Sequence, residues 1–179
     1  MILLLSEQQV VNTLRSECSG WINSMSSLEK KAFRKYTYNS YDNKPNRFFE
    51  RLNAMLRGGY NKADKNRLEL YSKVLSNAIK RHPLEHEIVC YKGTDYDPTI
   101  SISQGTKFYI DYFMSTSVIK TRALKGQYLL VIKVPAGSRG SYIEMVSAFP
   151  KQREFLLDKG CQYRFISKKG NVIRLEVIV

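Results

Sequence analysis

Residues 147–154 of the chain read Ser147-Ala148-Phe149-Pro150-Lys151-Gln152-Arg153-Glu154, and the apolar run Phe155-Leu156-Leu157 follows directly. A proline and polar residues placed before three apolar residues are typical of a turn that leads into a buried strand. Gln152 and Glu154 are two positions apart, which puts both side chains on one face if the chain is extended there. Most such pairs face solvent, so this spacing alone assigns no function.

The segments around this turn read as strands. Four stretches in the second half are apolar or alternate between apolar and polar residues: Ile88–Tyr91, Lys107–Ser117, Tyr128–Val134 and Ile173–Val179. The third is closed by Pro135-Ala136-Gly137, as expected where a strand ends. We therefore expect a β-rich second half.

The first half reads as helices. Apolar residues recur at helical spacing in three groups, and Ser26 with Glu29 forms a capping-box pattern before a further helix. The three groups are Val10, Val11, Leu14 and Cys18, then Phe48, Phe49, Leu52, Met55 and Leu56, then Leu68, Tyr71, Val74, Leu75, Ala78 and Ile79. Helices followed by strands predict an α+β fold, with N-terminal helices packed on a mixed β-sandwich core. No repeat or linker divides the chain, so we expect one domain over residues 1–179.

The bulk composition excludes several classes of protein. The 179 residues are 43% hydrophobic and contain 3 cysteines, an odd number that argues against a full disulfide framework. His82 and His86 are four apart but no third ligand is evident, so we expect no metal. The apolar run Met1–Leu5 is too short for a signal peptide or a membrane span, which leaves a cytoplasmic protein or one whose leader has been removed.

The net charge of +13 fits nucleic acid, an acidic membrane or an acidic protein as partner. The basic residues are spread along the chain, without a long basic run, zinc-finger spacing or an aromatic RNA-binding signature. Charge alone therefore selects no function, and a solvated basic face explains it equally well.

Two further strings accompany the turn. Tyr91-Lys92-Gly93-Thr94-Asp95 ends one expected strand, and Phe113-Met114-Ser115-Thr116-Ser117 ends another. Each is weak by itself, since hydroxyl runs usually make local hydrogen bonds. Together with Glu154 they supply a cation, hydroxyls and a carboxylate. These groups are the ones needed to hold a dinucleotide phosphate and to stabilise a cation that develops on a sugar.

The order of a strand-end R-G, then S-T-S, then [Q/E]-x-E resembles that of the bacterial mono-ADP-ribosyltransferases. The string S-A-F-x-x-Q-x-E is similar to the turn loop of the clostridial exoenzymes that modify Rho GTPases. Weaker matches cover most of the chain in a consistent order: Leu28–Lys31, Tyr36-Thr37, Leu52–Arg57 and Gly140–Ile143. The resemblance implies an ADP-ribosyltransferase-like fold.

The resemblance also implies roles for individual residues. Glu154 would be the catalytic carboxylate beside the ribose, oriented by Ser115, and Gln152 would select the acceptor. A carboxamide at position 152 suits an amide acceptor such as asparagine, whereas relatives that modify arginine carry glutamate there. Phe149 would anchor the protein substrate, although packing within its own loop is an equal alternative. The residues expected to bind NAD are Lys92, Gly93, Thr116, Ser117, Asn53, Arg57 and Thr37.

The chain departs from the family pattern at two positions. Lys92 stands where the family has arginine, which keeps the charge but loses the planar fork that clamps a phosphate. Gln127 follows Gly126 where the family has a phosphate-binding arginine, and Lys120, Arg122 or Lys125 would have to substitute for it. The chain also has an apparent insertion between Thr37 and Asn53 relative to the family, so the match at Thr37 depends on where that insertion is placed.

The expected function is that of a mono-ADP-ribosyltransferase of the glycosyltransferase class. It would cleave NAD as a substrate, with NAD glycohydrolase side activity, and transfer ADP-ribose to an asparagine of a host Rho-type GTPase. We expect a monomer that needs no metal, specific nucleic acid or membrane span. It would be a secreted toxin and virulence factor acting in the host cytosol, with a cytoplasmic location as the alternative. Two other functions stay open, a degenerate NAD-fold protein that binds a partner without catalysis and a basic nucleic-acid-binding domain.

Overall fold

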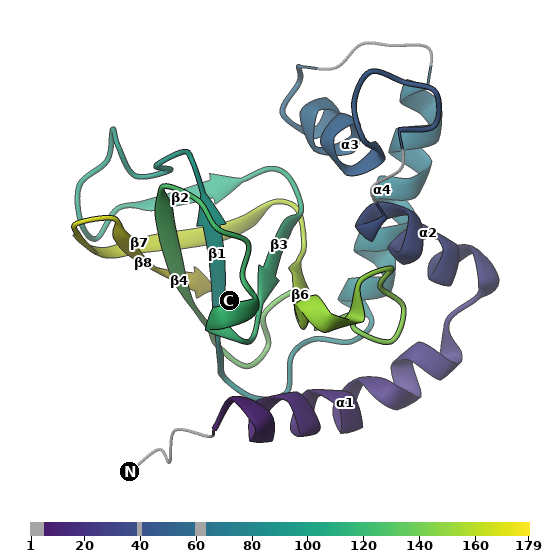
Figure 1. Ribbon diagram of the computed structural model, residues 1–179, viewed down its shortest axis with the longest axis horizontal. Coiled ribbons are helices and arrows are strands. Elements are labelled where there is room, and N and C mark those ends of the chain that lie inside the picture. Colours follow the sequence, from purple (N-terminus) through teal and green to yellow (C-terminus); the bar gives the residue numbers. More distant parts are fainter. Residues whose placement is uncertain (1–5, 39–40, 60–63) are drawn as a thin grey trace.

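The computed structural model describes residues 6–38, 41–59 and 64–179. Four helices come first: α1 (Glu7–Ser24), α2 (Ser27–Thr37), α3 (Phe48–Leu56) and α4 (Lys65–Lys80). Eight strands follow: β1 (Ile88–Thr94), β2 (Lys107–Ile110), β3 (Met114–Ser117), β4 (Tyr128–Val134), β5 (Gly140–Tyr142), β6 (Glu154–Leu157), β7 (Cys161–Lys169) and β8 (Val172–Ile178). Helices in the first half and strands in the second confirm the expected α+β fold (Figure 1). The run Met1–Leu5 lies outside the described residues.

The helices begin where the sequence provides caps. The Ser26 hydroxyl accepts a hydrogen bond from the Glu29 amide at 3.2 Å, and the Glu29 carboxylate accepts one from the Ser26 amide at 2.8 Å. This reciprocal capping box confirms the predicted start of α2. Ser6 and Gln9 make the same arrangement at the start of α1. Among the described residues no helix is long and apolar enough to cross a membrane.

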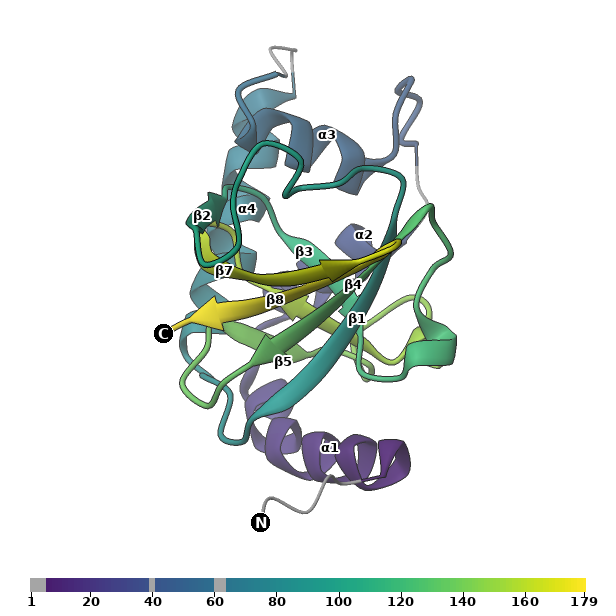
Figure 2. The same ribbon diagram turned by 90° about the vertical axis from the view of Figure 1, so that its left-hand side faces the viewer.

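The strands form one continuous mixed sheet in the order β2-β7-β8-β4-β1-β3-β6-β5. β4 and β8 run parallel, and the other neighbours run antiparallel. The sheet bends strongly, so that β7 and β8 lie far from the helices while β3 and β6 approach them (Figures 1 and 2). The expected mixed β core is therefore present as a single eight-stranded sheet.

The prediction of one strand over Lys107–Ser117 is wrong. β2 pairs with β7 at one edge of the sheet, whereas β3 lies between β1 and β6. The chain crosses between these places at Asp111–Phe113, where the Phe113 amide and carbonyl both bond to the Asn53 side chain at 3.3 Å. Because Asn53 on α3 supplies the hydrogen-bond partners of the Phe113 backbone, these groups do not pair within the sheet. β2 therefore ends before this point, and β3 begins after it.

The helices meet the sheet at its β5 end. α1 and α4 both contact β5, and α2, α3 and α4 pack on one another. The Trp21 indole on α1 donates to the Ala78 carbonyl on α4 at 2.9 Å, which fixes the angle between these two helices. This packing sets the ends of α2 and α3 opposite β1 and β3 (Figure 1), and residues from all four elements line one cleft.

Candidate active site

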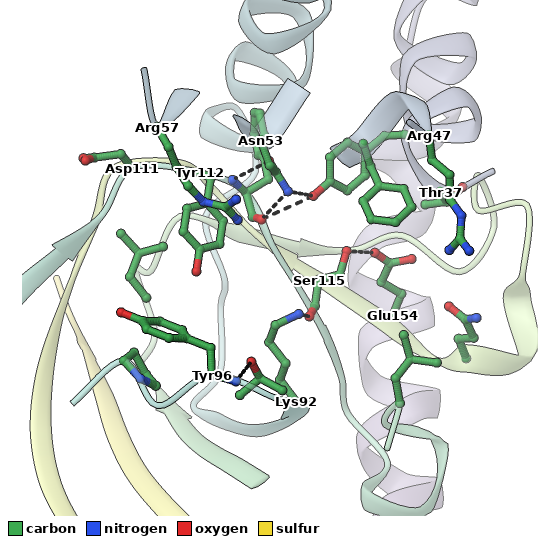
Figure 3. Close-up of a pocket in the computed structure, with 18 of the residues that line it drawn as sticks. Thr37, Arg47, Asn53, Arg57, Lys92, Tyr96, Asp111, Tyr112, Ser115 and Glu154 are labelled. Atoms are coloured by element: carbon green, nitrogen blue, oxygen red, sulfur yellow. Dashed lines mark hydrogen bonds between the residues drawn. The ribbon is translucent and has the colours of Figure 1, made fainter. Parts of the chain in front are cut away.

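A cleft of about 780 Å³ lies between the helices and the sheet. This volume falls within the range of about 300–1,000 Å³ common for small-molecule sites. Its walls come from the ends of α2 and α3, from β1, β3 and β6, and from the segment that joins β2 to β3. The candidate residues among those lining it are Thr37, Asn53, Arg57, Lys92, Ser115, Phe149, Gln152 and Glu154. The structure thus brings together most of the residues that the sequence singled out (Figure 3).

Ser115 and Glu154 are in direct contact. The Ser115 hydroxyl donates to the Glu154 Oε1 at 2.6 Å, and the two side chains point toward one another in Figure 3. Glu154 is the first residue of β6, which pairs antiparallel with β3. The residue is 5% exposed and lines the cleft, where two paired strands hold its carboxylate.

Burial controls the charge of this carboxyl group. Desolvation raises the pKa of Glu154 to about 7, against the opposing effects of the Ser115 hydrogen bond and the Lys92 charge. Desolvation also lowers the pKa of Lys92, while the nearby Glu154 raises it. The Lys92 ammonium donates to the Ser115 carbonyl at 3.1 Å. A cation, a hydroxyl and a carboxyl group therefore share one end of the cleft.

The three hydroxyls of Ser115-Thr116-Ser117 have different partners, and strand alternation accounts only for the opposite directions of Ser115 and Thr116. Thr116 donates to the Phe155 carbonyl at 2.6 Å and Ser117 donates to the Gln152 carbonyl at 2.8 Å. Both border only a smaller recess of about 50 Å³ beside the cleft. Ser115 alone of the three lines the cleft, while Thr116 and Ser117 hold β6 and the turn before it.

Asn53 and Arg57 reach the cleft from α3 and its C-terminal end. The Asn53 amide donates to the Tyr36 hydroxyl at 3.1 Å and to the Phe113 carbonyl, so its donors are already in use. The Arg57 guanidinium lies 4.0 Å from the centre of the Tyr112 ring. Asn53 therefore fastens α3 to the β2–β3 connection, and Arg57 presents an exposed cation at the rim.

Thr37 and Phe149 join the end of α2 to the 147–154 segment. The Thr37 hydroxyl donates to the Phe33 carbonyl at 3.0 Å and accepts from the Ala148 amide at 2.8 Å. Phe149 stacks on Tyr38 with ring centres 6.4 Å apart and remains partly exposed. The Thr37 contact thus holds the segment that carries Gln152 against the helices.

The segment containing Gln152 and Glu154 is a turn, as expected, but it is not extended. Pro150–Gln152 forms a 3-10 helix, and Arg153 has a left-handed backbone with φ of 52°. Both Gln152 and Glu154 nevertheless line the cleft. Their convergence results from the left-handed residue between them rather than from strand alternation.

A sequence profile of the ADP-ribosyltransferase exoenzyme family matches residues 15–175 of the chain. The chain belongs to this family. Solved structures with the same fold include the Clostridium limosum C3 exoenzyme, which gives a TM-score of 0.76 at 18% identity over 98% of this chain and 96% of that chain. C3stau2 from S. aureus, solved with NAD, gives a TM-score of 0.72 at 19% identity over 99% of this chain and 97% of that chain.

A curated relative of the chain is the NAD(+)–arginine ADP-ribosyltransferase EFV of Enterococcus faecalis. It is 28% identical over 175 residues, which cover 92% of this chain and 34% of EFV. The chain thus spans about a third of the length of this relative.

Several residues that line the cleft are not identified by the sequence patterns. Tyr36, Arg47, Tyr96, Asp111 and Tyr112 all line the cleft. Tyr36 adjoins the Thr37 match and Tyr96 follows the Lys92 string, so proximity to a motif was the available signal for these two. Arg47, Asp111 and Tyr112 belong to connecting segments, where no sequence period marks the inward-facing residue.

Of the three basic residues expected to substitute for the family's phosphate-binding arginine, only Arg122 lines a described pocket. Lys120–Arg122 forms a short 3-10 helix, and Arg122 borders the smaller recess. The backbone amide of Gln127 donates to the Asp95 carboxylate at 3.0 Å. Arg122 is thus the best placed of the three substitutes.

The two histidines of the chain make separate contacts. The His82 ring stacks on Trp21 at 5.3 Å, and its Nε2 lies 3.2 Å from the Glu17 carbonyl oxygen. Ligand atoms of His86, Glu17 and Glu85 lie within 4.8 Å of one another. His86 also pairs directly with Glu17, so an ordinary ion pair accounts for this contact.

Gly93 brings β1 into contact with the segment before β4. A Cβ on Gly93 would lie 1.8 Å from the Leu124 carbonyl oxygen, and one on Gly126 would lie 2.4 Å from the Thr94 amide nitrogen. Leu124 lines the cleft beside Lys92. Glycine at position 93 therefore permits the close approach that closes this side of the site.

We expect Gly93→Ala to lower the free energy of unfolding of the protein by about 1–3 kcal/mol, because backbone atoms must move to admit the methyl group. Gly20→Ala is the matched control, since a Cβ there meets nothing within 4 Å and a helical alanine is favoured over glycine. Thermal or urea unfolding of both variants checks this. Equal stability of Gly93→Ala and wild type would show that the backbone near Leu124 accommodates the methyl group without a loss of unfolding free energy.

Proposed function

We propose that the chain is a mono-ADP-ribosyltransferase that cleaves NAD in this cleft and transfers ADP-ribose to a protein side chain. The observation that carries the proposal is the buried, hydrogen-bonded Ser115–Glu154 pair in a cleft that is also lined by basic side chains. Membership of the exoenzyme family supports it.

The side chains of the cleft match the parts of NAD. Arg47, Arg57 and Lys92 supply positive charge for a pyrophosphate. Aromatic side chains offer flat surfaces for the nicotinamide and adenine rings, among them Phe49, Tyr96 and Tyr112. The Glu154 carboxylate is then the group that contacts a ribose of NAD. No described residue is needed as a metal ligand in this scheme.

The chemistry follows from the position of Glu154. As the bond between nicotinamide and ribose breaks, positive charge moves from the nicotinamide onto the ribose. A fixed carboxylate beside the ribose stabilises that state more than it stabilises bound NAD, which is the requirement for catalysis. The Ser115 hydroxyl fixes the carboxylate, and Lys92 favours its ionised form. Water in place of a protein acceptor would give NAD glycohydrolase activity.

The proposed acceptor is an amide side chain, as in asparagine, on a host Rho-type GTPase. Gln152 at the cleft offers a carboxamide, which both donates and accepts hydrogen bonds as an asparagine side chain does. Partly exposed Phe149 lies beside it as an apolar contact for the acceptor protein. In this role the chain would be a secreted toxin that acts in the host cytosol as a monomer.

Arginine is a second candidate acceptor, because the curated relative is named as an arginine-specific transferase. A guanidinium acceptor is best met by a carboxylate. Position 152 is glutamine, and Glu154 is engaged by Ser115 and Lys92. Incubation with a Rho-type GTPase and, separately, with an arginine ester decides between the two acceptors.

We expect Gln152→Glu to lower transfer to the GTPase by about tenfold or more while NAD hydrolysis changes by less than about threefold. The reason is that residue 152 meets the acceptor, whereas Glu154 meets the ribose. Labelled ADP-ribose incorporated into the GTPase, and nicotinamide released without it, measure the two activities. Equal losses in both assays would contradict this division of roles. A gain of transfer to the arginine ester would agree with it.

A further inference from the structure

The turn before β6 contains an unusual backbone conformation. Arg153 lies between Gln152 and Glu154 with φ of 52° and ψ of 48°, in the left-handed region. Arginine has no local reason to adopt this region, which is favoured by glycine and, among other residues, by asparagine and aspartate. Such conformations persist where surrounding contacts impose them, often at functional sites.

The Arg153 side chain makes an ion pair beside this turn. The Arg153 guanidinium pairs with the carboxylate of Glu144, which is 8% exposed and follows β5. On its other side the same carboxylate accepts two hydrogen bonds from Arg15 of α1, both at 2.8 Å. The Tyr142 hydroxyl donates to it at 2.7 Å. Glu144 is therefore a fixed buried anion, and its position does not depend on Arg153 alone.

Backbone contacts on either side of the turn complete the arrangement. The Val118 amide donates to the Arg153 carbonyl and the Ile143 amide to the Glu154 carbonyl, each at 3.1 Å. Glu154 is further held by the β3–β6 ladder. Gln152, in contrast, precedes the strand, and its orientation depends on the turn itself.

We propose that Arg153 is a positioning residue, held by Glu144 in the left-handed conformation that aims Gln152 into the cleft that Glu154 occupies. This inference rests on the proposed function, since it assigns Arg153 to the acceptor side of the transfer reaction. Without the ion pair, residue 153 gains a more common backbone conformation, and the Gln152 carboxamide turns away while Glu154 stays in its strand.

The test compares three variants of the full chain. Arg153→Ala removes the pairing guanidinium, and Arg153→Lys keeps a cation that can still reach Glu144. Arg15→Ala is the matched control, because it removes the other arginine from the same carboxylate and leaves the turn unaltered. The measured quantities are kcat and KM for GTPase modification and for NAD hydrolysis.

A displacement of about 1 Å at a reacting group costs up to about 10²-fold in rate, so we expect Arg153→Ala to lower kcat for transfer about tenfold. NAD hydrolysis should change by less than about threefold, because Glu154 keeps its place. Arg153→Lys should recover most of the transfer, and Arg15→Ala should lose little of either activity. Equal loss of both activities in Arg153→Ala, or the same loss in Arg15→Ala, would mean general loosening and overturn the proposal.

Amide hydrogen exchange gives an outcome that needs no enzymatic activity. The backbone amide of Val118 donates to the Arg153 carbonyl, and the backbone amide of Gln152 donates to the Phe149 carbonyl at 3.0 Å. We expect both to lose protection at least about tenfold in Arg153→Ala and to keep it in Arg15→Ala. If wild type fails to cleave NAD, the proposed function fails, while unchanged protection in Arg153→Ala would separately overturn the role of Arg153.

Discussion

Glu154→Gln is expected to reduce NAD cleavage about 10²- to 10³-fold, the usual cost of removing one preorganised electrostatic contact from a transition state. The amide nearly matches the carboxylate in volume and still accepts the Ser115 hydrogen bond, so the change isolates the charge. NAD affinity should weaken much less than turnover, because positive charge reaches the ribose only as the bond breaks. Nicotinamide release at saturating NAD, with affinity from calorimetry, measures both quantities.

The same variant should not lose stability. The pKa of Glu154 is raised in the folded protein from 4.5 to about 7, so the folded state holds its proton more tightly than the unfolded state. The stability from this proton is present below the unfolded pKa and is lost as pH rises through about 7. At pH ~8 the buried carboxylate therefore opposes folding, and Glu154→Gln should raise the unfolding free energy by about 1–3 kcal/mol.

Glu69→Gln on α4 is a suitable control, because its side chain is 45% exposed and pairs only with Lys65 among the ion pairs of the described residues. It should leave both cleavage and stability close to those of wild type. Near wild-type cleavage by Glu154→Gln would show that Glu154 is not catalytic. Loss of cleavage together with loss of the fold would assign Glu154 a structural role.

The second large effect is the pH dependence of NAD cleavage. Only the ionised form of Glu154 stabilises the ribose cation, so kcat/KM should rise with pH through a midpoint of about 7. With that midpoint, activity at pH ~5.5 should be about 30-fold below activity at pH ~8. The charged or titratable groups acting on Glu154 are Lys92, whose cation favours ionisation, and the neighbouring Tyr36.

Initial rates at low NAD concentration across this pH range give the profile of the free enzyme. The residual activity of Glu154→Gln should not show this rise of kcat/KM with pH, because the titrating carboxyl group is gone. A wild-type midpoint near the ordinary value of 4.5 would show that Glu154 is not desolvated as its burial implies. A step that persists in Glu154→Gln would assign the titration to another group.

The sequence predicted best those features that depend on neighbouring residues. The capping box at Ser26 and the apolar stripe of α4 are local patterns, and both structures form where expected. The turn before Phe155 was also predicted from its proline and polar residues. β7 was missed although Cys161, Tyr163 and Phe165 alternate as a half-buried strand should.

Features that depend on distant contacts were not predictable in this way. The break between β2 and β3 arises because Asn53, 60 positions before Phe113, takes its backbone hydrogen bonds. The same contacts occupy the Asn53 side chain, which was expected to face NAD. Arg51 illustrates the same limit, since ion pairs with Asp42 and Asp64 allow a charged side chain to be 1% exposed.

The candidate site contains features of both kinds, some that follow from neighbouring residues and some that depend on distant contacts. Strand alternation already implies that Ser115 and Thr116 face opposite sides, so the buried hydroxyl of Thr116 follows from the sequence. The left-handed turn at Arg153 does not, because arginine carries no local preference for it and its partner Glu144 lies outside the turn. The convergence of Gln152 and Glu154 therefore required the three-dimensional structure.

A crystal structure of Glu154→Gln with NAD bound would locate the substrate directly. We expect the nicotinamide ribose within hydrogen-bond distance, ~3.2 Å or less, of residue 154. The pyrophosphate should lie against Arg57 or Lys92, two of the cations that line the cleft. NAD bound elsewhere on the protein, or in the cleft with its nicotinamide ribose away from Ser115 and residue 154, would contradict the assignment of this cleft as the site of NAD cleavage.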